Sequence, residues 1–148
     1  MTEYDIARPY TAVFVIFRHD GKIAFVLRKN TDWMNNYYGL PAGKVEKNET
    51  FLEAAVREAK EEVGVDIDPQ DLKLVLTFHR VHPDSTWVDI MFEAAQWKGE
   101  IYNAEPEVHG EVAWFDPTQL PDNIVPPVRE ALEAIERGET YLEKSYHD

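Results

Sequence analysis

The sequence predicts a mixed α/β fold in a single domain that covers residues 1–148. Short runs of β-branched and aromatic residues, typical of buried strands, alternate with two segments that have the apolar spacing of helices. No internal repeat, low-complexity tract or linker divides the chain, and 148 residues is close to the common length of one domain. A hydrophobic content of 44% is sufficient for a buried core and excludes a disordered chain.

The first elements form a predicted hairpin followed by a long loop. Residues 10–18 read Tyr-Thr-Ala-Val-Phe-Val-Ile-Phe-Arg and predict a buried strand. Asp20-Gly21 is a hairpin signal, and residues 23–28 predict the second strand. Residues 30–49 are rich in Asn, Gly, Pro and aromatic side chains and have no periodicity. We expect a loop there, and a loop of that length in a compact domain is usually functional.

Residues 50–62 predict a helix. Thr50 or Asn48 can cap its start, and Gly64 is a typical C-terminal stop. The apolar residues recur at helical spacing, namely Leu52, Ala55, Val56, Ala59 and Val63.

The second half predicts three further strands and a second helix. Residues 72–79 and 86–97 predict two strands, which the residues 82–85 (His-Pro-Asp-Ser) join in a turn. Residues 111–115 predict a short strand. The helix predicted after Pro126-Pro127 ends at Gly138. We expect this last helix to pack against the rest of the domain and the tail that follows it to end in solvent.

Composition excludes several classes of protein. The absence of cysteine excludes disulfides, thiol catalysis and cysteine-bound metal centres. No apolar run approaches the ~18 residues of a membrane span, and the start of the chain lacks the apolar stretch of a signal peptide. We therefore expect a cytoplasmic protein, as a monomer or a homodimer.

The net charge of −13 argues against binding to nucleic acid or to an anionic membrane. Residues 1–80 hold 11 basic and 13 acidic side chains, whereas residues 81–148 hold 4 and 15. An anion-binding site is therefore expected in the first half.

Three glutamates in the helix 50–62 suggest a metal site. Glu58, Glu61 and Glu62 share one helix face, where like charges repel and oppose the helix dipole near its C-terminus. A hard divalent cation such as Mg²⁺ or Mn²⁺ would neutralise them. The alternative is an acidic face in contact with solvent.

The surrounding residues resemble the signature of the Nudix hydrolases, G-x5-E-x7-R-E-U-x-E-E-x-G-U, in which U is a bulky aliphatic residue. Eight residues between positions 43 and 65 fall on its places: Gly43, Glu49, Arg57, Glu58, Glu61, Glu62, Gly64 and Val65. Ala59 is small for its aliphatic place. Residues 39–44 (Gly-Leu-Pro-Ala-Gly-Lys) resemble the segment that precedes the signature in MutT-like members.

The resemblance implies a Nudix fold, an α/β/α sandwich with a central mixed sheet and a loop–helix–loop metal site. It implies a metal-dependent hydrolase of nucleoside diphosphate derivatives, in which Glu58, Glu61 and Glu62 hold Mg²⁺ or Mn²⁺. Glu58, Glu61 and Arg57 are the implied catalytic group, with Arg57 orienting a glutamate. Gly43 and Glu49 are implied as supporting residues.

The general base stays open between a glutamate of the signature and a carboxylate on a later loop. Glu105, Glu107 and Glu111 are the later candidates. MutT-like members often carry a further metal-binding glutamate before the strand that reads Trp-Phe here, and Glu107 or Glu105 is nearest to that place. We include Glu107 among the predicted metal ligands.

Five side chains are predicted to contact the substrate: Arg28, Lys44, Tyr38, Arg80 and Asn123. The small size and the Pro-Ala-Gly-Lys segment favour a (deoxy)nucleoside triphosphate, cleaved to monophosphate and pyrophosphate. Another nucleoside diphosphate derivative, such as a nucleotide sugar or a dinucleoside polyphosphate, is the alternative substrate. A nucleotide-sensing module without turnover is the alternative from another class.

Overall fold

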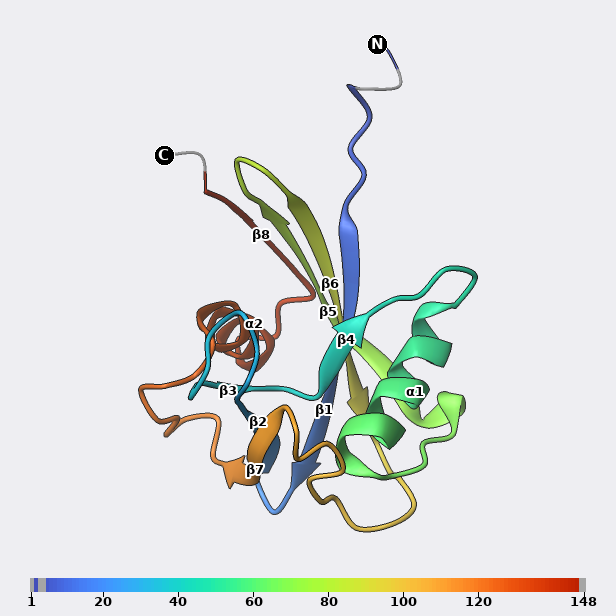
Figure 1. The fold of residues 1–148 in the computed structure, drawn as a ribbon, viewed down its shortest axis with the longest axis vertical. Coiled ribbons are helices and arrows are strands. Elements are labelled where there is room, and N and C mark those ends of the chain that lie inside the picture. Colours follow the sequence, from blue (N-terminus) through green and yellow to red (C-terminus); the bar gives the residue numbers. More distant parts are fainter. Residues whose placement is uncertain (1, 3–4, 147–148) are drawn as a thin grey trace.

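The computed structural model describes residue 2 and residues 5–146 as a sheet between two helices. Helix α1 (Phe51–Val63) lies on one side of the sheet and helix α2 (Pro126–Glu136) on the other, as Figure 1 shows. The arrangement confirms the predicted mixed fold. Within the described residues, no helix has the length and apolarity needed to cross a membrane.

Over residues 5–146 the sheet has eight strands in the order β3-β2-β1-β6-β5-β8, with β4 paired to β1 and β7 paired to β2. Two pairs are parallel, β1 with β6 and β5 with β8, and the others are antiparallel. The strands are β1 (Tyr10–His19), β2 (Lys22–Arg28), β3 (Tyr38–Gly39), β4 (Ala42–Lys44), β5 (Leu72–Val81), β6 (Thr86–Ala94), β7 (His109–Phe115) and β8 (Tyr141–Ser145).

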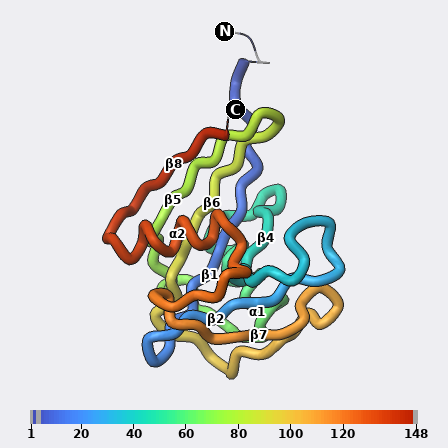
Figure 2. Tube along the Cα trace, turned by 90° about the vertical axis from the view of Figure 1, so that its left-hand side faces the viewer, coloured from blue at the N-terminus to red at the C-terminus, as the bar shows by residue number. Residues whose placement is uncertain are grey.

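Alternation along the central strands builds two cores. Val13 and Val15 of β1 point to the α1 side, where they pack with Ala55 and Ala59 of the helix. On the α2 side, Leu132 packs with β1 and β2, and other residues of α2 pack with β5 and β6. Figure 2 shows β8, β5, β6 and β1 running side by side above this packed region.

Three of the predicted boundaries need correction. The predicted loop 30–49 contains the short strands β3 and β4, which the periodicity of so few residues cannot reveal. The predicted strand 86–97 ends at Ala94, which pairs with Leu72, the first residue of its partner β5.

Strand β8 is the third correction, since we expected only a solvated tail there. Its sequence, Tyr-Leu-Glu-Lys-Ser, has no apolar alternation, and 51% of Tyr141 is exposed. The strand forms by backbone pairing with the free edge of β5. Residues 147 and 148, which the tail prediction included, lie outside the described residues.

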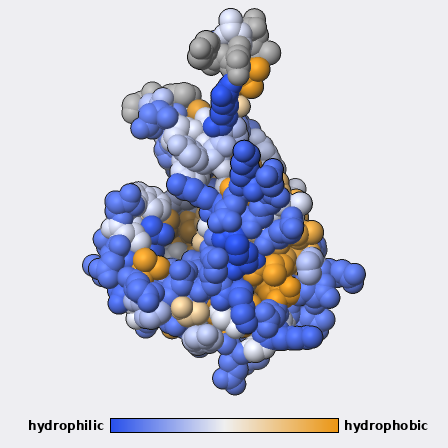
Figure 3. All heavy atoms as spheres, turned by 45° about the vertical axis from the view of Figure 1, so that its right-hand side comes forward, coloured by the Kyte–Doolittle hydropathy of each residue, from blue (hydrophilic) through white to orange (hydrophobic). Residues whose placement is uncertain are grey.

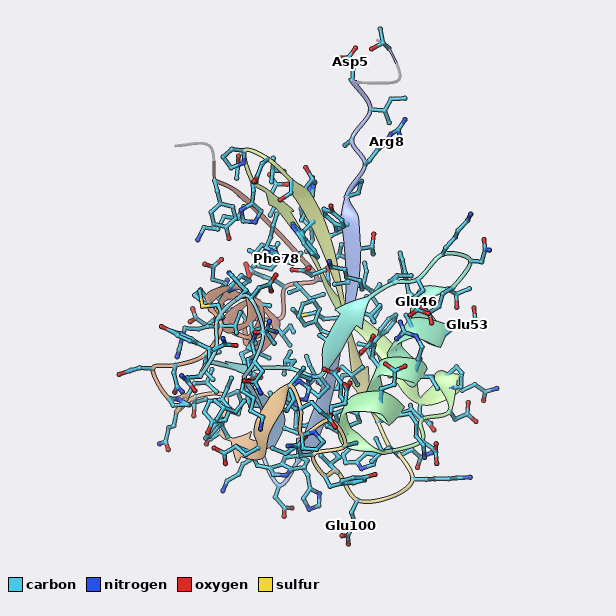
Figure 4. The ribbon with its side chains drawn as sticks, in the orientation of Figure 1. Asp5, Arg8, Glu46, Glu53, Phe78 and Glu100 are labelled. Atoms are coloured by element: carbon cyan, nitrogen blue, oxygen red, sulfur yellow. The ribbon has the colours of Figure 1, made fainter. Side chains whose placement is uncertain are left out.

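The start of α1 is held by a capping box. The Thr50 hydroxyl accepts a hydrogen bond from the Glu53 amide at 3.1 Å, and the Glu53 carboxylate accepts one from the Thr50 amide at 2.9 Å. Figure 4 shows Glu53 and Glu46 at this end of the helix. Both backbone donors are thereby satisfied, so the first turn of α1 is fixed at a defined place.

Thr50→Ala is expected to lower the free energy of unfolding by about 1 kcal/mol, because the helix loses its cap. Thr50→Ser keeps the hydroxyl and should stay near the wild-type value. Urea denaturation of the three proteins measures the difference. Equal stability of Thr50→Ala and wild type would show that the cap is not needed.

Candidate active site

Strand β4 brings backbone against the carboxylates of α1. The Ala42 amide donates to Glu62 Oε2 at 2.6 Å. At the next residue, a Cβ atom on Gly43 would overlap the carboxyl group of Glu58. The absence of a side chain at Gly43 therefore leaves the space that Glu58 occupies.

Arg57 organises three glutamates around its guanidinium group. It donates to Glu49 Oε2 and Oε1 at 2.6 and 2.9 Å, to Glu58 Oε1 at 2.7 Å and to Glu61 Oε2 at 3.3 Å. It also donates to the carbonyl oxygen of Lys44 at 3.2 Å. The hydrogen bond from Arg57 is the main cause that lowers the pKa of Glu49 to about 2. Arg57 thus fixes the orientation of Glu58 and leaves its Oε2 unbound by the guanidinium.

The three glutamates of α1 differ in exposure. The side chains of Glu58 and Glu62 are 12% and 8% exposed, whereas that of Glu61 is 50% exposed. Burial raises the pKa of Glu58 to about 7, against the opposing effect of Arg57. Burial, followed by the neighbouring charge of Glu58, raises the pKa of Glu62 well above its usual value. Ionising both groups is therefore unfavourable without an added positive charge.

A second group of ligand atoms converges on Glu62. Glu62, Glu105 and His109 each offer one atom, and these atoms lie within 4.8 Å of one another. His109 Nε2 is 3.4 Å from Glu62 Oε1. Its buried Nδ1 has no hydrogen-bond partner within the described residues. Burial, with the charges of Glu61 and Glu107 in addition, raises the pKa of Glu105.

The geometry favours Glu105 over Glu107 as the additional ligand. Glu107 is exposed and is not among the three residues that converge, although its carbonyl oxygen accepts a hydrogen bond from Asn30 Nδ2 at 3.0 Å. The segment turns so that the His109 amide donates to the Glu105 carbonyl oxygen at 3.0 Å, which places these two residues on one side. Sequence reasoning missed His109, whose only signal was its spacing of four from Glu105.

This donor set fits a divalent cation such as Mg²⁺ or Mn²⁺. It consists mainly of carboxylate oxygens, the ligands that these ions prefer. In addition to burial, the charges of neighbouring glutamates raise the pKa values of Glu58, Glu62 and Glu105, so the site carries an excess of negative charge. A cation would remove that excess.

A cavity of about 530 Å³ opens on the α2 side of the sheet, next to Gly43. Its floor is apolar and comes from strands β1 and β6, with Ala12, Phe14 and Met91. In Figure 3 a recess on the left of the view shows apolar side chains between hydrophilic rims. We call this space the sheet cavity, and its size is in the usual range for small-molecule sites.

Three of the five predicted substrate residues line the sheet cavity: Arg28, Lys44 and Arg80. Lys44 Nζ lies 5.3 Å from the ring centroid of Tyr10 and 5.6 Å from that of Trp87. Arg80 donates to both carboxylate oxygens of the buried Asp89, at 2.7 and 3.2 Å. Trp87 and Trp33 are the two tryptophans in the lining, in addition to Phe14, and sequence reasoning did not single out Trp87.

Tyr38 and Asn123, the other two predicted contacts, do not line the sheet cavity. The Tyr38 hydroxyl donates to Glu111 Oε1 at 2.7 Å, and this hydrogen bond is the main cause that raises the pKa of Tyr38 to about 12. Asn123 Nδ2 donates to the carbonyl oxygen of Asn36 at 2.9 Å. The Tyr38 side chain links β3 to β7 and that of Asn123 links two loops, so their predicted contact with substrate has no support from the cavity.

The raised pKa values predict how stability depends on pH in the absence of metal. A carboxyl group whose pKa rises on folding favours the folded state at low pH and loses that contribution as pH rises through the folded value. For Glu58 this window extends from its ordinary value of 4.5 to about 7, and Glu62 shifts in the same direction. The contribution of these two groups to the free energy of unfolding should therefore fall as pH rises through this window.

Urea denaturation in EDTA, at several pH values across this window, measures the effect. Wild type should lose more stability than the Glu58→Gln variant between the lowest and the highest pH. Addition of Mg²⁺ at the highest pH should restore stability in the wild type. The same slope in both proteins would contradict the assignment to Glu58.

Among models of protein families, that of the NUDIX domain matches residues 7–135 of this chain. The chain is 32% identical over 118 residues to the 8-oxo-dGTP diphosphatase of Escherichia coli, an alignment that covers 79% of this chain and 88% of that protein. It is 29% identical to human 8-oxo-dGDP phosphatase NUDT18 over 143 residues, covering 93% of this chain but only 41% of that protein. The crystal structure of a MutT NUDIX hydrolase from Burkholderia pseudomallei aligns with a TM-score of 0.77 and 28% identity, covering 85% of this chain and 97% of that one.

Proposed function

Because this chain belongs to the Nudix hydrolase family, we propose that it hydrolyses a (deoxy)nucleoside triphosphate to the monophosphate and pyrophosphate. The proposal includes dependence on Mg²⁺, for which Mn²⁺ can substitute. The observation that carries it is the group of carboxylates around Glu62 and Glu58, which lie against Ala42 and Gly43 of β4, two residues that also line the sheet cavity.

Four residues are the proposed metal ligands: Glu58, Glu61, Glu62 and Glu105. In that place, bound Mg²⁺ would neutralise phosphate charge and lower the pKa of water. Glu62 is held by the Ala42 amide and has little freedom to turn away. His109 lies next to it and supports its Oε1 from the side of β7.

We assign the role of proton acceptor to Glu58 Oε2. Arg57 binds only the other oxygen, Oε1, and so orients the carboxylate without occupying Oε2. A carboxylate oxygen that the guanidinium leaves open can accept a proton from the attacking water. Gly43 leaves the space for this carboxylate.

The sheet cavity is the proposed place of the nucleotide. Lys44 and Arg28 supply positive charge to its phosphates near the carboxylates, and Trp33 or Trp87 offers an aromatic face for the base. The two relatives named above differ in substrate, a triphosphate for the one and a diphosphate for the other. The released product therefore discriminates between these two classes.

The deciding experiment is a panel of substrates assayed for pyrophosphate and for phosphate, with Mg²⁺ and with EDTA. The panel holds normal and 8-oxo nucleoside triphosphates, 8-oxo-dGDP, nucleotide sugars and dinucleoside polyphosphates. Pyrophosphate from triphosphates, only with Mg²⁺, is the expected result. Phosphate from the diphosphate, or turnover of the other compounds alone, would replace the proposed substrate. No release from any compound would favour a nucleotide-sensing module.

A further inference from the structure

Strand β8 pairs with β5 next to Arg80, a residue of the sheet cavity, and the proposed hydrolysis does not use this pairing. In the parallel pairing with β5, Lys144 is the partner of Arg80 and Ser145 is the partner of Val81. The amide of the next residue, Tyr146, donates to the carbonyl oxygen of Val81 at 2.8 Å. This register brings the side chain of Tyr146 beside His82.

The rings of Tyr146 and His82 are stacked. Their centroids are 4.3 Å apart and their planes differ by 4°. His82 begins the turn between β5 and β6, where its amide donates to the carbonyl oxygen of Ser85 at 2.8 Å. The stack therefore covers one face of the imidazole and restrains the turn that carries it. His82 and Ser85 both line the sheet cavity.

The side chain of Lys144 also contacts the ring of Tyr146. Lys144 Nζ lies 5.1 Å from the centroid of this ring and forms an ion pair with Glu130 Oε1 of α2 at 2.7 Å. The backbone of Tyr146 is thus tied to β5, and its ring is flanked by a cation that is tied to α2. A ring held in this way is a rigid support for His82.

His82 contacts Arg80, and both residues line the sheet cavity. Arg80 Nη1 is 3.4 Å from His82 Nε2, and the other nitrogens of Arg80 bind Asp89, whose side chain is 1% exposed. Arg80 also lies over the ring of Trp87, at 5.5 Å from its centroid. Movement of His82 would therefore change the position of Arg80 and of the aromatic wall.

We propose that Tyr146 is a positioning residue of the nucleotide site, which acts by stacking on His82 and fixing Arg80 and the β5–β6 turn at the cavity wall. This inference rests on the proposed function in one respect, because the affinity that it affects is that for a nucleotide. The chemistry occurs at the carboxylates of α1, so KM should respond and kcat should not.

The test compares wild type with Tyr146→Ala, Tyr146→Phe and Tyr141→Ala. Loss of the ring should raise KM for the nucleoside triphosphate by about threefold to tenfold, with kcat within about twofold of wild type. Tyr146→Phe keeps the stack and should restore KM. Tyr141 is the first residue of β8, five residues before Tyr146 and therefore on the opposite side of the extended chain, where it is exposed, so Tyr141→Ala should match wild type.

A double-mutant cycle with His82→Ala separates positioning from general damage. If Tyr146 acts through His82, Tyr146→Ala should have no further effect on KM in the His82→Ala background. Additive effects, or a wild-type KM for Tyr146→Ala, would overturn the inference.

The NMR signals of the His82 ring provide a readout that needs no turnover. They should shift in Tyr146→Ala and stay near the wild-type positions in Tyr146→Phe, because ring stacking determines them. Unchanged signals in Tyr146→Ala would overturn the inference. Absence of turnover by wild type, with the His82 signals still shifting, would overturn the proposed function and leave the support of His82 by Tyr146 in place.

Discussion

The double variant Glu61→Gln/Glu62→Gln is expected to lose Mg²⁺-dependent turnover by about a thousandfold or more. The two substitutions remove two of the four proposed ligand carboxylates and keep nearly the same side-chain volumes. Glutamine at position 62 can still accept the hydrogen bond that the Ala42 amide now donates to Glu62. Steady-state assays over a range of Mg²⁺ concentrations, with calorimetric titration of Mn²⁺, measure the loss.

The same variant should be as stable as wild type, or more stable, in EDTA. The carboxylate of Glu62 is buried beside Glu58, and its replacement removes a charge that the fold desolvates. The matched control is Glu100→Gln/Glu133→Gln, which changes the net charge equally at two exposed positions outside the group of carboxylates; Figure 4 shows Glu100 at the lower edge of the view. Turnover by the double variant near the wild-type rate would refute the metal assignment.

Local spacing was sufficient to place three glutamates on one face of a helix, while their role as a metal site came from the resemblance to the Nudix signature. Glu58, Glu61 and Glu62 share a face because the helical period places them there, and α1 was predicted to within one residue at each end. The strands β1 and β2 were predictable for a related reason, since their residues are apolar and β-branched over most of their length.

The remaining parts of the site depend on pairing between distant segments, which spacing does not encode. The choice between Glu105 and Glu107 as a metal ligand depends on the turn between Glu105 and His109, whose backbone has no regular repeat that a sequence could indicate. Arg80 faces Asp89 only because of the register between β5 and β6, which places Phe78 opposite Asp89 and Arg80 opposite Trp87. The same register explains why Trp87 was missed. Its pairing with Arg80 places it at the cavity, and the residues around Trp87 in the sequence do not reveal that pairing.

Gly43→Ala is expected to lower turnover by about a hundredfold and the free energy of unfolding by about 1–3 kcal/mol. A methyl group at this position would overlap the carboxyl group of Glu58, which must then leave its place or push β4 away from α1. Either movement misplaces the proposed proton acceptor. Gly39→Ala is the control for stability, because its Cβ would meet only Val125 Cγ2 at 3.8 Å, an ordinary contact.

The cause of the damage can be isolated by removing the other partner of the overlap. In the Glu58→Ala background there is no carboxyl group for the new methyl group to meet, so Gly43→Ala should cost less than about 0.5 kcal/mol of stability. Urea denaturation of the four proteins of this cycle gives the coupling between the two positions. An equal cost of Gly43→Ala in both backgrounds would mean that Gly43 is needed for the path of β4 itself. A large coupling would mean that the glycine is needed at this position because the carboxylate of Glu58 must lie against the backbone of β4.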